Sequence, residues 1–248
     1  VVEQEEIAPA IFELVLEGEM VEAMRAGQFL HLRVPDDAHL LRRPISISSI
    51  NKDKKQCHLI YRIEGAGTAI FSTLRQGDTL DVMGPQGNGF DLSDLDNQSQ
   101  VLLVGGGIGV PPLLEVAKEL HARGVKVVTV LGFANKDAVI LETELAQYGQ
   151  VFVTTDDGSY GIKGNVSAII NDLENQFDAV YSCGAPGMMK YINQRFHDHP
   201  RAYLSLESRM ACGMGACYAC VLKVPDSETV SQRVCEDGPV FRTGTVML

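Results

Sequence analysis

The stretch Val101-Leu-Leu-Val-Gly-Gly-Gly-Ile-Gly-Val-Pro-Pro112 decides the fold of the central part of the chain. The apolar residues fit a buried strand, the glycines fit a tight turn, and the prolines fit the first turn of a helix, where a missing N–H loses no hydrogen bond. A strand, a glycine turn and a helix in this order present backbone N–H groups and a positive helix end to a pyrophosphate. The strict G-x-G-x-x-G pattern fails at Val110, so a tight turn without a ligand is the alternative.

The candidate residues for a nucleotide at this turn are Gly105, Gly106, Gly107, Gly109 and Pro111. No acidic residue stands about 20 residues further on to bind a ribose hydroxyl. The next strand leads into the segment 132–137, where no arginine is present to bind a 2′-phosphate and Lys136 is the available cation. The pattern therefore favours NAD over NADP.

Towards the C-terminus, apolar strands alternate with helical segments as far as Leu206. This alternation is typical of an α/β unit with a parallel sheet and helices on its faces. We expect helices at 111–122, 141–148, 166–173 and 187–196, and strands at 125–131, 151–154, 179–183 and 203–206.

Towards the N-terminus, residues 11–83 contain short alternating runs separated by Gly, Pro and Asp turns, which predict an antiparallel β-barrel or sandwich. Leu30, Leu32 and Val34 share one face of a strand, and His31 and Arg33 share the other. Further strands are expected at 45–50, 56–63 and 79–83, and a short helix is expected at Gly67, with Thr68 as its N-cap. The predicted domains are 1–97, 98–206 and 207–248.

The third unit contains the sequence Cys212-Gly-Met-Gly-Ala-Cys217-Tyr-Ala-Cys220, followed after fourteen residues by Cys235. The C-x4-C-x2-C…C spacing is typical of plant-type [2Fe-2S] proteins. Gly213 and Gly215 suit a loop that must turn its amides toward a cluster, because glycine has no Cβ and adopts positive φ. The candidate ligands are Cys212, Cys217, Cys220 and Cys235. A zinc site or disulfides are the alternatives.

Composition limits the partners of the chain. The 248 residues include 32 acidic and 21 basic side chains, for a net charge of −11, which argues against nucleic acid and against an anionic membrane. No apolar run approaches the roughly 18 residues of a membrane helix, and the acidic N-terminus is unlike a signal peptide. We therefore expect a cytoplasmic protein.

Residues 42–46 read Arg-Arg-Pro-Ile-Ser. Guanidinium groups beside a proline-fixed backbone suit bidentate contact with phosphate. The alternative is a pair of solvated surface charges.

Three motifs in this order resemble the ferredoxin-NADP reductase superfamily: Arg43-Pro-Ile-Ser46, the glycine turn 105–112, and Cys183-Gly-Ala-Pro186. The segment Glu207–Cys220 more narrowly resembles the electron-transfer subunits of the NAD-dependent, class B dihydroorotate dehydrogenases. The resemblance covers essentially the whole chain.

This resemblance implies an FAD site on the barrel. Arg43 would hold the FAD phosphates, and Pro44, Ile45 and Ser46 would line the isoalloxazine ring. The superfamily often has an aromatic residue in place of Ile45, and Tyr61 is expected to supply some of that surface, with ordinary core packing as its alternative. The remaining FAD residues would be Ile60 and Arg62 beside Tyr61, and Gly67 and Thr68 at a helix N-terminus.

The resemblance also implies that NAD binds at the glycine turn and that Cys183 lies beside the path of the hydride. A buried thiol at the end of a strand is the alternative for Cys183.

As a whole, the resemblance implies an electron-transfer subunit. An FMN-containing catalytic subunit would oxidise dihydroorotate, and electrons would pass through [2Fe-2S] and FAD to NAD+ in pyrimidine biosynthesis. The usual assembly is a heterotetramer of two catalytic and two electron-transfer subunits. The alternatives are a related FAD and iron-sulfur subunit serving a ferredoxin, sulfide or hydrogenase system, and a redox sensor without enzymatic activity.

Overall fold

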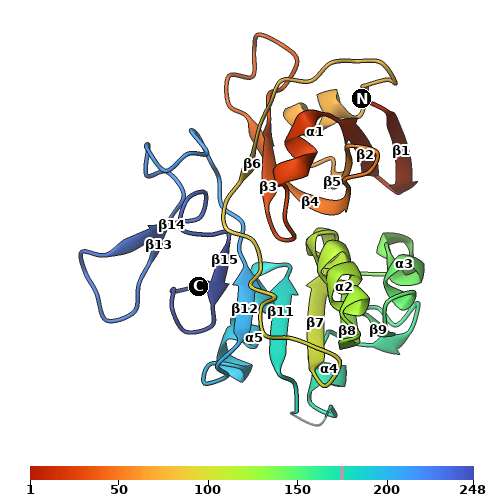
Figure 1. Cartoon of the computed structure of the whole chain (residues 1–248), viewed down its shortest axis with the longest axis vertical. Coiled ribbons are helices and arrows are strands. Elements are labelled where there is room, and N and C mark those ends of the chain that lie inside the picture. Colours follow the sequence, from red (N-terminus) through yellow and green to blue (C-terminus); the bar gives the residue numbers. More distant parts are fainter. Residues whose placement is uncertain (174–175) are drawn as a thin grey trace.

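The computed structural model describes residues 1–173 and 176–248. It consists of two sheets arranged one above the other, with the C-terminal unit at their side (Figure 1). The upper, N-terminal sheet is antiparallel, and the lower sheet is built from parallel strands and helices. Within the described residues, no helix is both long and apolar enough to cross a membrane.

The N-terminal unit is a curled sheet of six strands in the order β1-β2-β5-β4-β3-β6, with antiparallel pairing throughout. Leu30 and Leu32 point into its core, as expected, together with Leu14, Leu16 and Leu59. Its elements are β1 (Glu3–Ala8), β2 (Ile11–Glu17), η1 (Glu19–Ala23), β3 (Phe29–Leu32), β4 (Arg43–Asn51), β5 (Gln56–Arg62), α1 (Ala66–Phe71) and β6 (Val82–Gln86).

The expected N-cap of helix α1 is wrong. The helix begins at Ala66 with Gly65 as N-cap, so Thr68 lies inside its first turn. The Thr68 hydroxyl accepts the backbone N–H of Glu64 at 3.0 Å and that of Gly65 at 3.2 Å, and donates to the carbonyl of Gly65 at 3.0 Å. A side chain at the third helical position can therefore satisfy groups that precede the helix, which sequence spacing alone does not distinguish from an N-cap.

The second unit is a seven-stranded sheet in the order β10-β9-β8-β7-β11-β12-β15. Its parallel strands and its helices alternate along the chain as the sequence predicts. They are β7 (Gln100–Gly106), η2 (Gly107–Gly109), α2 (Pro112–Ala122), β8 (Lys126–Phe133), η3 (Lys136–Ala138), α3 (Glu142–Ala146), β9 (Gln150–Thr155), β10 (Ile162–Lys163), α4 (Ser167–Ile170), β11 (Ala179–Cys183), α5 (Pro186–Arg195) and β12 (Ala202–Ser205).

Helices cover both faces of this sheet. Val101 and Leu103 of β7 belong to the same core cluster as residues of α2 and α3. Leu102 and Val104 belong to a second cluster, which includes residues of α4 and α5. Because side chains alternate along a strand, a strand that is covered on both faces needs a continuous apolar run, as 101–104 provides.

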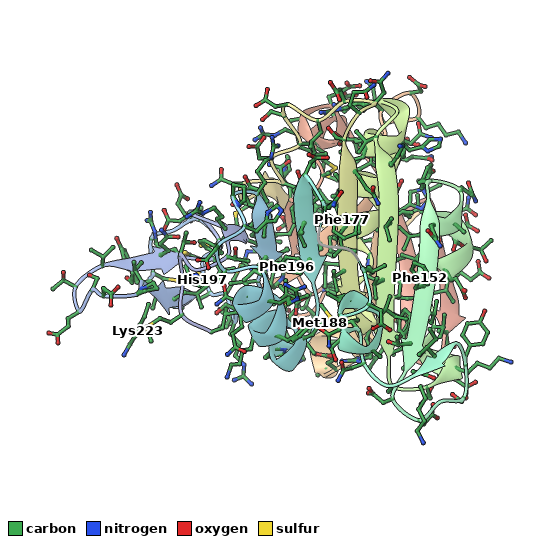
Figure 2. All side chains as sticks on the ribbon, turned by 90° about the horizontal axis from the view of Figure 1, so that it is seen from below. Phe152, Phe177, Met188, Phe196, His197 and Lys223 are labelled. Carbon is green, nitrogen blue, oxygen red and sulfur yellow. The ribbon has the colours of Figure 1, made fainter. Side chains whose placement is uncertain are left out.

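The sheet is mixed rather than wholly parallel, because the C-terminal segment joins it. Strand β15 (Val240–Arg242) pairs antiparallel with β12, so it occupies the edge that β12 would otherwise expose. The remaining C-terminal strands, β13 (Val221–Lys223) and β14 (Ser231–Arg233), form a hairpin. Figure 2 shows this hairpin, marked by Lys223, projecting from the side of the α/β unit.

Candidate cofactor sites

A cavity of about 740 Å³ lies where the three parts of the chain meet. Its volume is within the usual range for a small-molecule site. The antiparallel unit contributes most of the wall, Ile108 and Pro186 come from the α/β unit, and residues 205–210 and Pro239 complete it. All nine residues that the resemblance assigns to FAD line this cavity: Arg43, Pro44, Ile45, Ser46, Ile60, Tyr61, Arg62, Gly67 and Thr68.

The two adjacent arginines have different surroundings. Arg42 donates to the carboxylate of Asp81 at 2.9 Å and to its carbonyl at 3.0 Å, so its charge is paired. Arg43 donates to the carbonyls of Leu41 at 2.7 Å and Arg42 at 3.4 Å, and no described carboxylate lies within ion-pair distance of it. A Cβ at Gly67 would lie 2.8 Å from Nε of Arg43, so only glycine lets this guanidinium lie against α1. Arg43 is therefore a cation in the cavity wall without a carboxylate partner in the described chain.

Tyr61 packs in the core and also lines the cavity. The side chain is buried, stacks on Phe12 with ring centroids 6.0 Å apart, and meets the edge of Phe71. Its hydroxyl donates to Oε1 of Gln4 at 3.0 Å, and burial raises its pKa. Core packing therefore accounts for most of the Tyr61 side chain, and the rest of it belongs to the cavity wall.

Glu207 lines the cavity, although the sequence did not suggest it as a site residue. The residue is exposed. The protein packed around its carboxyl group and the charge of Glu64 raise its pKa, while the charge of Arg62 opposes this shift. Phe29, Arg209 and Met210 also line the cavity. No local motif marks these residues, because the cavity wall is assembled from distant segments of the chain.

The glycines of residues 105–109 meet different requirements. A Cβ at Gly106 would lie 2.8 Å from the sulfur of Met188, and a Cβ at Gly109 would lie 2.6 Å from the carbonyl oxygen of Cys183. Gly105 is similarly confined, by Val110 at 2.9 Å. Gly107 instead has a φ of +53° and open space where a side chain would be. Tight packing therefore accounts for three of the glycines, and Gly107 leaves an open backbone surface.

Pro111 is the N-cap of α2, and Pro112 is the first helical residue. The helix thus begins one residue later than expected. It still opens shortly after the glycine turn, so the turn and the helix N-terminus are neighbours.

Cys183 lies at the C-terminal end of β11, between Gly105 of β7 and Ser205 of β12. Its side chain is buried, and the buried environment together with the charge of Glu207 raises the pKa of its thiol. Ser205 and Pro186 line the cavity, whereas Cys183 is not among its lining residues. This geometry agrees with the buried-thiol alternative.

The cysteines of the third unit lie in two pairs. Sγ of Cys220 is 3.3 Å from Sγ of Cys235, and both side chains are buried. Cys212 and Cys217 interact through their side chains and are more accessible, since Cys212 is half-buried and Cys217 is exposed. Backbone N–H groups of Met214, Cys217 and Ala216 lower the pKa of Cys212 to about 7. One pair therefore faces the interior and the other faces outward.

This arrangement fits a two-iron cluster better than the alternatives. Two thiolates on one tetrahedral ion, at metal–sulfur distances of about 2.3 Å, lie about 3.8 Å apart, close to the separation of the inner pair. Among the described residues, no three His, Cys, Asp or Glu side chains converge as ligands of a single ion, which disfavours zinc, and all six cysteines are free thiols.

The glycine predictions for the loop are confirmed. Gly213 has a φ of +70° and packs against the ring of His31, and Gly215 has a φ of +78°. The N–H of Gly215 donates to Sγ of Cys235 at 3.2 Å, and its carbonyl accepts from Nη1 of Arg233 at 3.0 Å. Arg233 is in turn held by Asp237, with Nε 3.0 Å from the carboxylate. The loop is therefore held in shape by the protein itself.

Comparisons with known proteins agree with this division. Three family models match: an oxidoreductase FAD-binding domain over residues 1–90, an oxidoreductase NAD-binding domain over 103–194, and the iron-sulfur cluster binding domain of dihydroorotate dehydrogenase B over 207–247. The chain thus has the domains that bind FAD, NAD and an iron-sulfur cluster.

Individual relatives are similar over their whole length. The electron transfer subunit of dihydroorotate dehydrogenase B (NAD(+)) from Streptococcus pneumoniae (strain ATCC BAA-255 / R6) is 93% identical over 248 residues, covering 100% of this chain and 97% of the relative. The subunit of the same name from Geobacillus kaustophilus (strain HTA426) is 52% identical, covering 100% of this chain and 97% of the relative.

Among solved structures, an NADH-dependent reduced ferredoxin-NADP oxidoreductase matches with a TM-score of 0.88 and 30% identity, over 100% of this chain and 88% of that one. The chain therefore belongs to the family of electron transfer subunits of dihydroorotate dehydrogenase B (NAD(+)).

Proposed function

We propose that this chain carries electrons from the FMN of a dihydroorotate dehydrogenase catalytic subunit, through a [2Fe-2S] cluster and FAD, to NAD+ in pyrimidine biosynthesis. The observation that supports this most directly is the cavity where the three units meet. Met210 lines it, and Cys212 follows only two residues later, while Ile108 of the glycine turn lies on another part of its wall. The three cofactor regions therefore adjoin one another.

The cofactors supply the redox chemistry: a cluster exchanges single electrons, a nicotinamide exchanges a hydride, and a flavin does both. The protein binds and orients them. We propose that Arg43 pairs with the FAD phosphates, because it is a cation in the cavity wall that no described carboxylate neutralises and it lies against the first turn of α1. Pro44, Ile45 and Ser46 follow it on β4 and would line the flavin ring.

On the α/β side, we propose that the turn Gly105–Gly109 and Pro111 receive NAD. The open backbone at Gly107 supports this, because its missing side chain leaves the surface accessible. Cys183 would act as a soft contact at the end of β11 next to the hydride path. Because burial raises the pKa of its thiol, this contact would be made by a neutral thiol and not by a thiolate.

We further propose that the catalytic subunit docks on the cysteine loop, in a heterotetramer of two catalytic and two electron-transfer subunits. Large apolar side chains are exposed at and near this loop, with Met214 56% and Tyr218 60% accessible. Cys217 is exposed beside them, which would bring a cluster close to the partner.

We propose a cytoplasmic location and domains of 1–97, 98–206 and 207–248.

The test is anaerobic purification of the chain with its catalytic partner, followed by measurement of NAD+ reduction that depends on dihydroorotate. Reduction that requires both proteins is the expected result. A flavin and iron-sulfur complex that oxidises NADH but does not react with dihydroorotate would indicate another partner. A strong preference for NADPH over NADH would also indicate another partner. A protein that binds cluster and flavin but reduces no added acceptor would indicate a redox sensor.

A further inference from the structure

Helix α2 carries a buried carboxylate that bonds to the antiparallel unit. The side chain of Glu115 is only 6% exposed, and its Oε2 accepts the backbone N–H of Ile50 at 2.8 Å and the hydroxyl of Ser49 at 3.2 Å. Lys118, one helical turn later, donates from Nζ to the carbonyl of Ile50 at 2.6 Å and to Oε2 of Glu115 at 3.1 Å. Both backbone polar groups of Ile50 are thus bonded by side chains of α2.

The strand that receives these bonds is irregular at this point. The register of β4 against β5 shifts between Ile47 and Ser49, as in a β-bulge. Beyond this shift Ile50 is again in register, opposite Cys57 of β5, whereas β3 pairs with β4 only over Arg43–Ser46. The N–H of Ile50 therefore points to an edge of β4 that has no strand beside it, and Glu115 supplies its acceptor.

Other contacts support the same attachment. At the end of α2, Nη1 of Arg123 donates to the carbonyl of Leu92 at 2.6 Å, which lies in the segment that connects the two units. Apolar residues of α2, such as Leu113 and Val116, share a core cluster with Ile11 and Ile60 of the antiparallel unit. In Figure 1, α2 lies directly below β4. The helix is therefore fixed to the other unit by packing and by oriented polar bonds.

The two elements that Glu115 joins each begin at a cofactor region. Strand β4 starts with Arg43–Ser46, which lines the cavity, and helix α2 starts directly after the glycine turn 105–109. Ile50 and Glu115 lie further along these elements. A bond between them therefore restricts how the nucleotide turn is oriented relative to the cavity.

We infer that Glu115 is a positioning residue that sets the alignment of the nicotinamide and flavin sites, acting through Ser49 and Ile50 of β4. This inference rests on the proposed function. Hydride transfer between two bound rings depends steeply on their separation and angle, and a displacement of about 1 Å can lower a rate by about a hundredfold. Packing alone permits small sliding of one unit on the other, whereas the bonds to one peptide group define a single arrangement.

The test uses the full-length subunit with its cofactors and compares Glu115→Ala with Glu115→Gln. Alanine removes the acceptor of the Ile50 N–H, while glutamine keeps an oxygen in the same place. Glu144→Ala on α3 is the matched control, because it removes an exposed glutamate from a helix of the same unit. The measurements are FAD content, the rate of flavin reduction over a range of NADH concentrations, and amide exchange at Ile50.

For Glu115→Ala, we expect faster amide exchange at Ile50 and unchanged FAD content. The flavin reduction rate at saturating NADH should fall about ten- to hundredfold, with little change in the NADH concentration that gives half the maximal rate. Glu115→Gln should restore most of the rate, and Glu144→Ala should match the wild type. A wild-type rate in Glu115→Ala together with faster exchange at Ile50 would overturn the inference.

Should the alanine variant fail to fold or lose FAD, Glu115→Asp provides a milder displacement of the same carboxylate. Its saturating rate is expected to fall while FAD content stays the same, and a wild-type rate with faster exchange at Ile50 contradicts the inference. Failure of the proposed function is distinguishable, because it would appear in the wild-type protein as absent transfer from dihydroorotate. The comparison of flavin reduction by NADH among the variants does not require that partner.

Discussion

The sulfur atoms of Cys220 and Cys235 lie 3.3 Å apart on the buried side of the cysteine loop, although fourteen residues separate them in sequence. The strands β13 and β14 form the hairpin between them, which brings the two ends of this segment together. The Cys212 and Cys217 side chains form the more accessible pair. The loop therefore presents one pair of ligands to the protein and one to the surface.

Cys217→Ser is expected to abolish the cluster while FAD stays bound. The variant removes an exposed thiolate ligand, and Cys217 is not among the residues that line the FAD cavity. Iron and sulfide analysis and flavin absorbance after anaerobic gel filtration would measure the two contents separately. Loss of both cofactors would show that the two sites depend on each other.

Arg43→Ala is expected to weaken FAD binding. A hydrogen bond to a charged group contributes about 1.5–3 kcal/mol, which corresponds to a dissociation constant about 10- to 150-fold higher. Arg33→Ala is the control, because Arg33 is an exposed arginine of the same unit, 3.7 Å from Asp81. Equilibrium titration of the FAD-depleted variants and wild type with FAD would give their dissociation constants. Equal constants for Arg43→Ala and the wild type would show that Arg43 is only a surface charge.

Gly213→Ala is expected to destabilise the protein by about 1–3 kcal/mol, because the residue has a positive φ and the new methyl group would overlap the ring of His31. Gly187→Ala in α5 is the contrasting variant, since no neighbouring atom lies within 4 Å of its added Cβ. A glycine-to-alanine change within a helix stabilises by about 0.5–1 kcal/mol. Thermal unfolding of both variants would test the difference, and a harmless Gly213→Ala would contradict the close contact with His31.

Glu119→Gln is expected to make the protein more resistant to urea than the wild type at neutral pH, and equally resistant at acidic pH. Burial and the neighbouring Glu115 raise the pKa of Glu119 above its usual 4.5, with Arg123 opposing. The folded state therefore holds the proton more tightly than the unfolded state, so stability falls as pH rises from about 4.5 through the folded pKa. Glutamine carries no charge, and its advantage over the wild type should grow over that range and vanish below it. Urea midpoints measured across the range would check this, and an advantage independent of pH would exclude the charge as its cause.

Local patterns in the sequence predicted much of the fold. The run 101–104 and the glycines after it predicted a strand, a turn and a helix, because strand burial and turn geometry depend on neighbouring residues. The spacing of the four cysteines likewise predicted a cluster loop, since ligands on a short loop are fixed by the number of residues between them. The candidate FAD residues came from the resemblance, and the cavity brings all nine together.

Contacts between the units were decided by the tertiary structure. Alternation placed His31 on the face opposite the core leucines, and the structure buries its ring completely, with Gly213 of the cysteine loop packed against it. The bond between Glu115 and Ile50 joins residues 65 positions apart, and Glu207 reaches the cavity from another unit. Periodicity reports which face of an element is apolar, but not which distant segment will cover the other face. Which segment covers that face depends on how whole sheets and helices pack together. In this protein, the same packing determines how the cofactor regions meet.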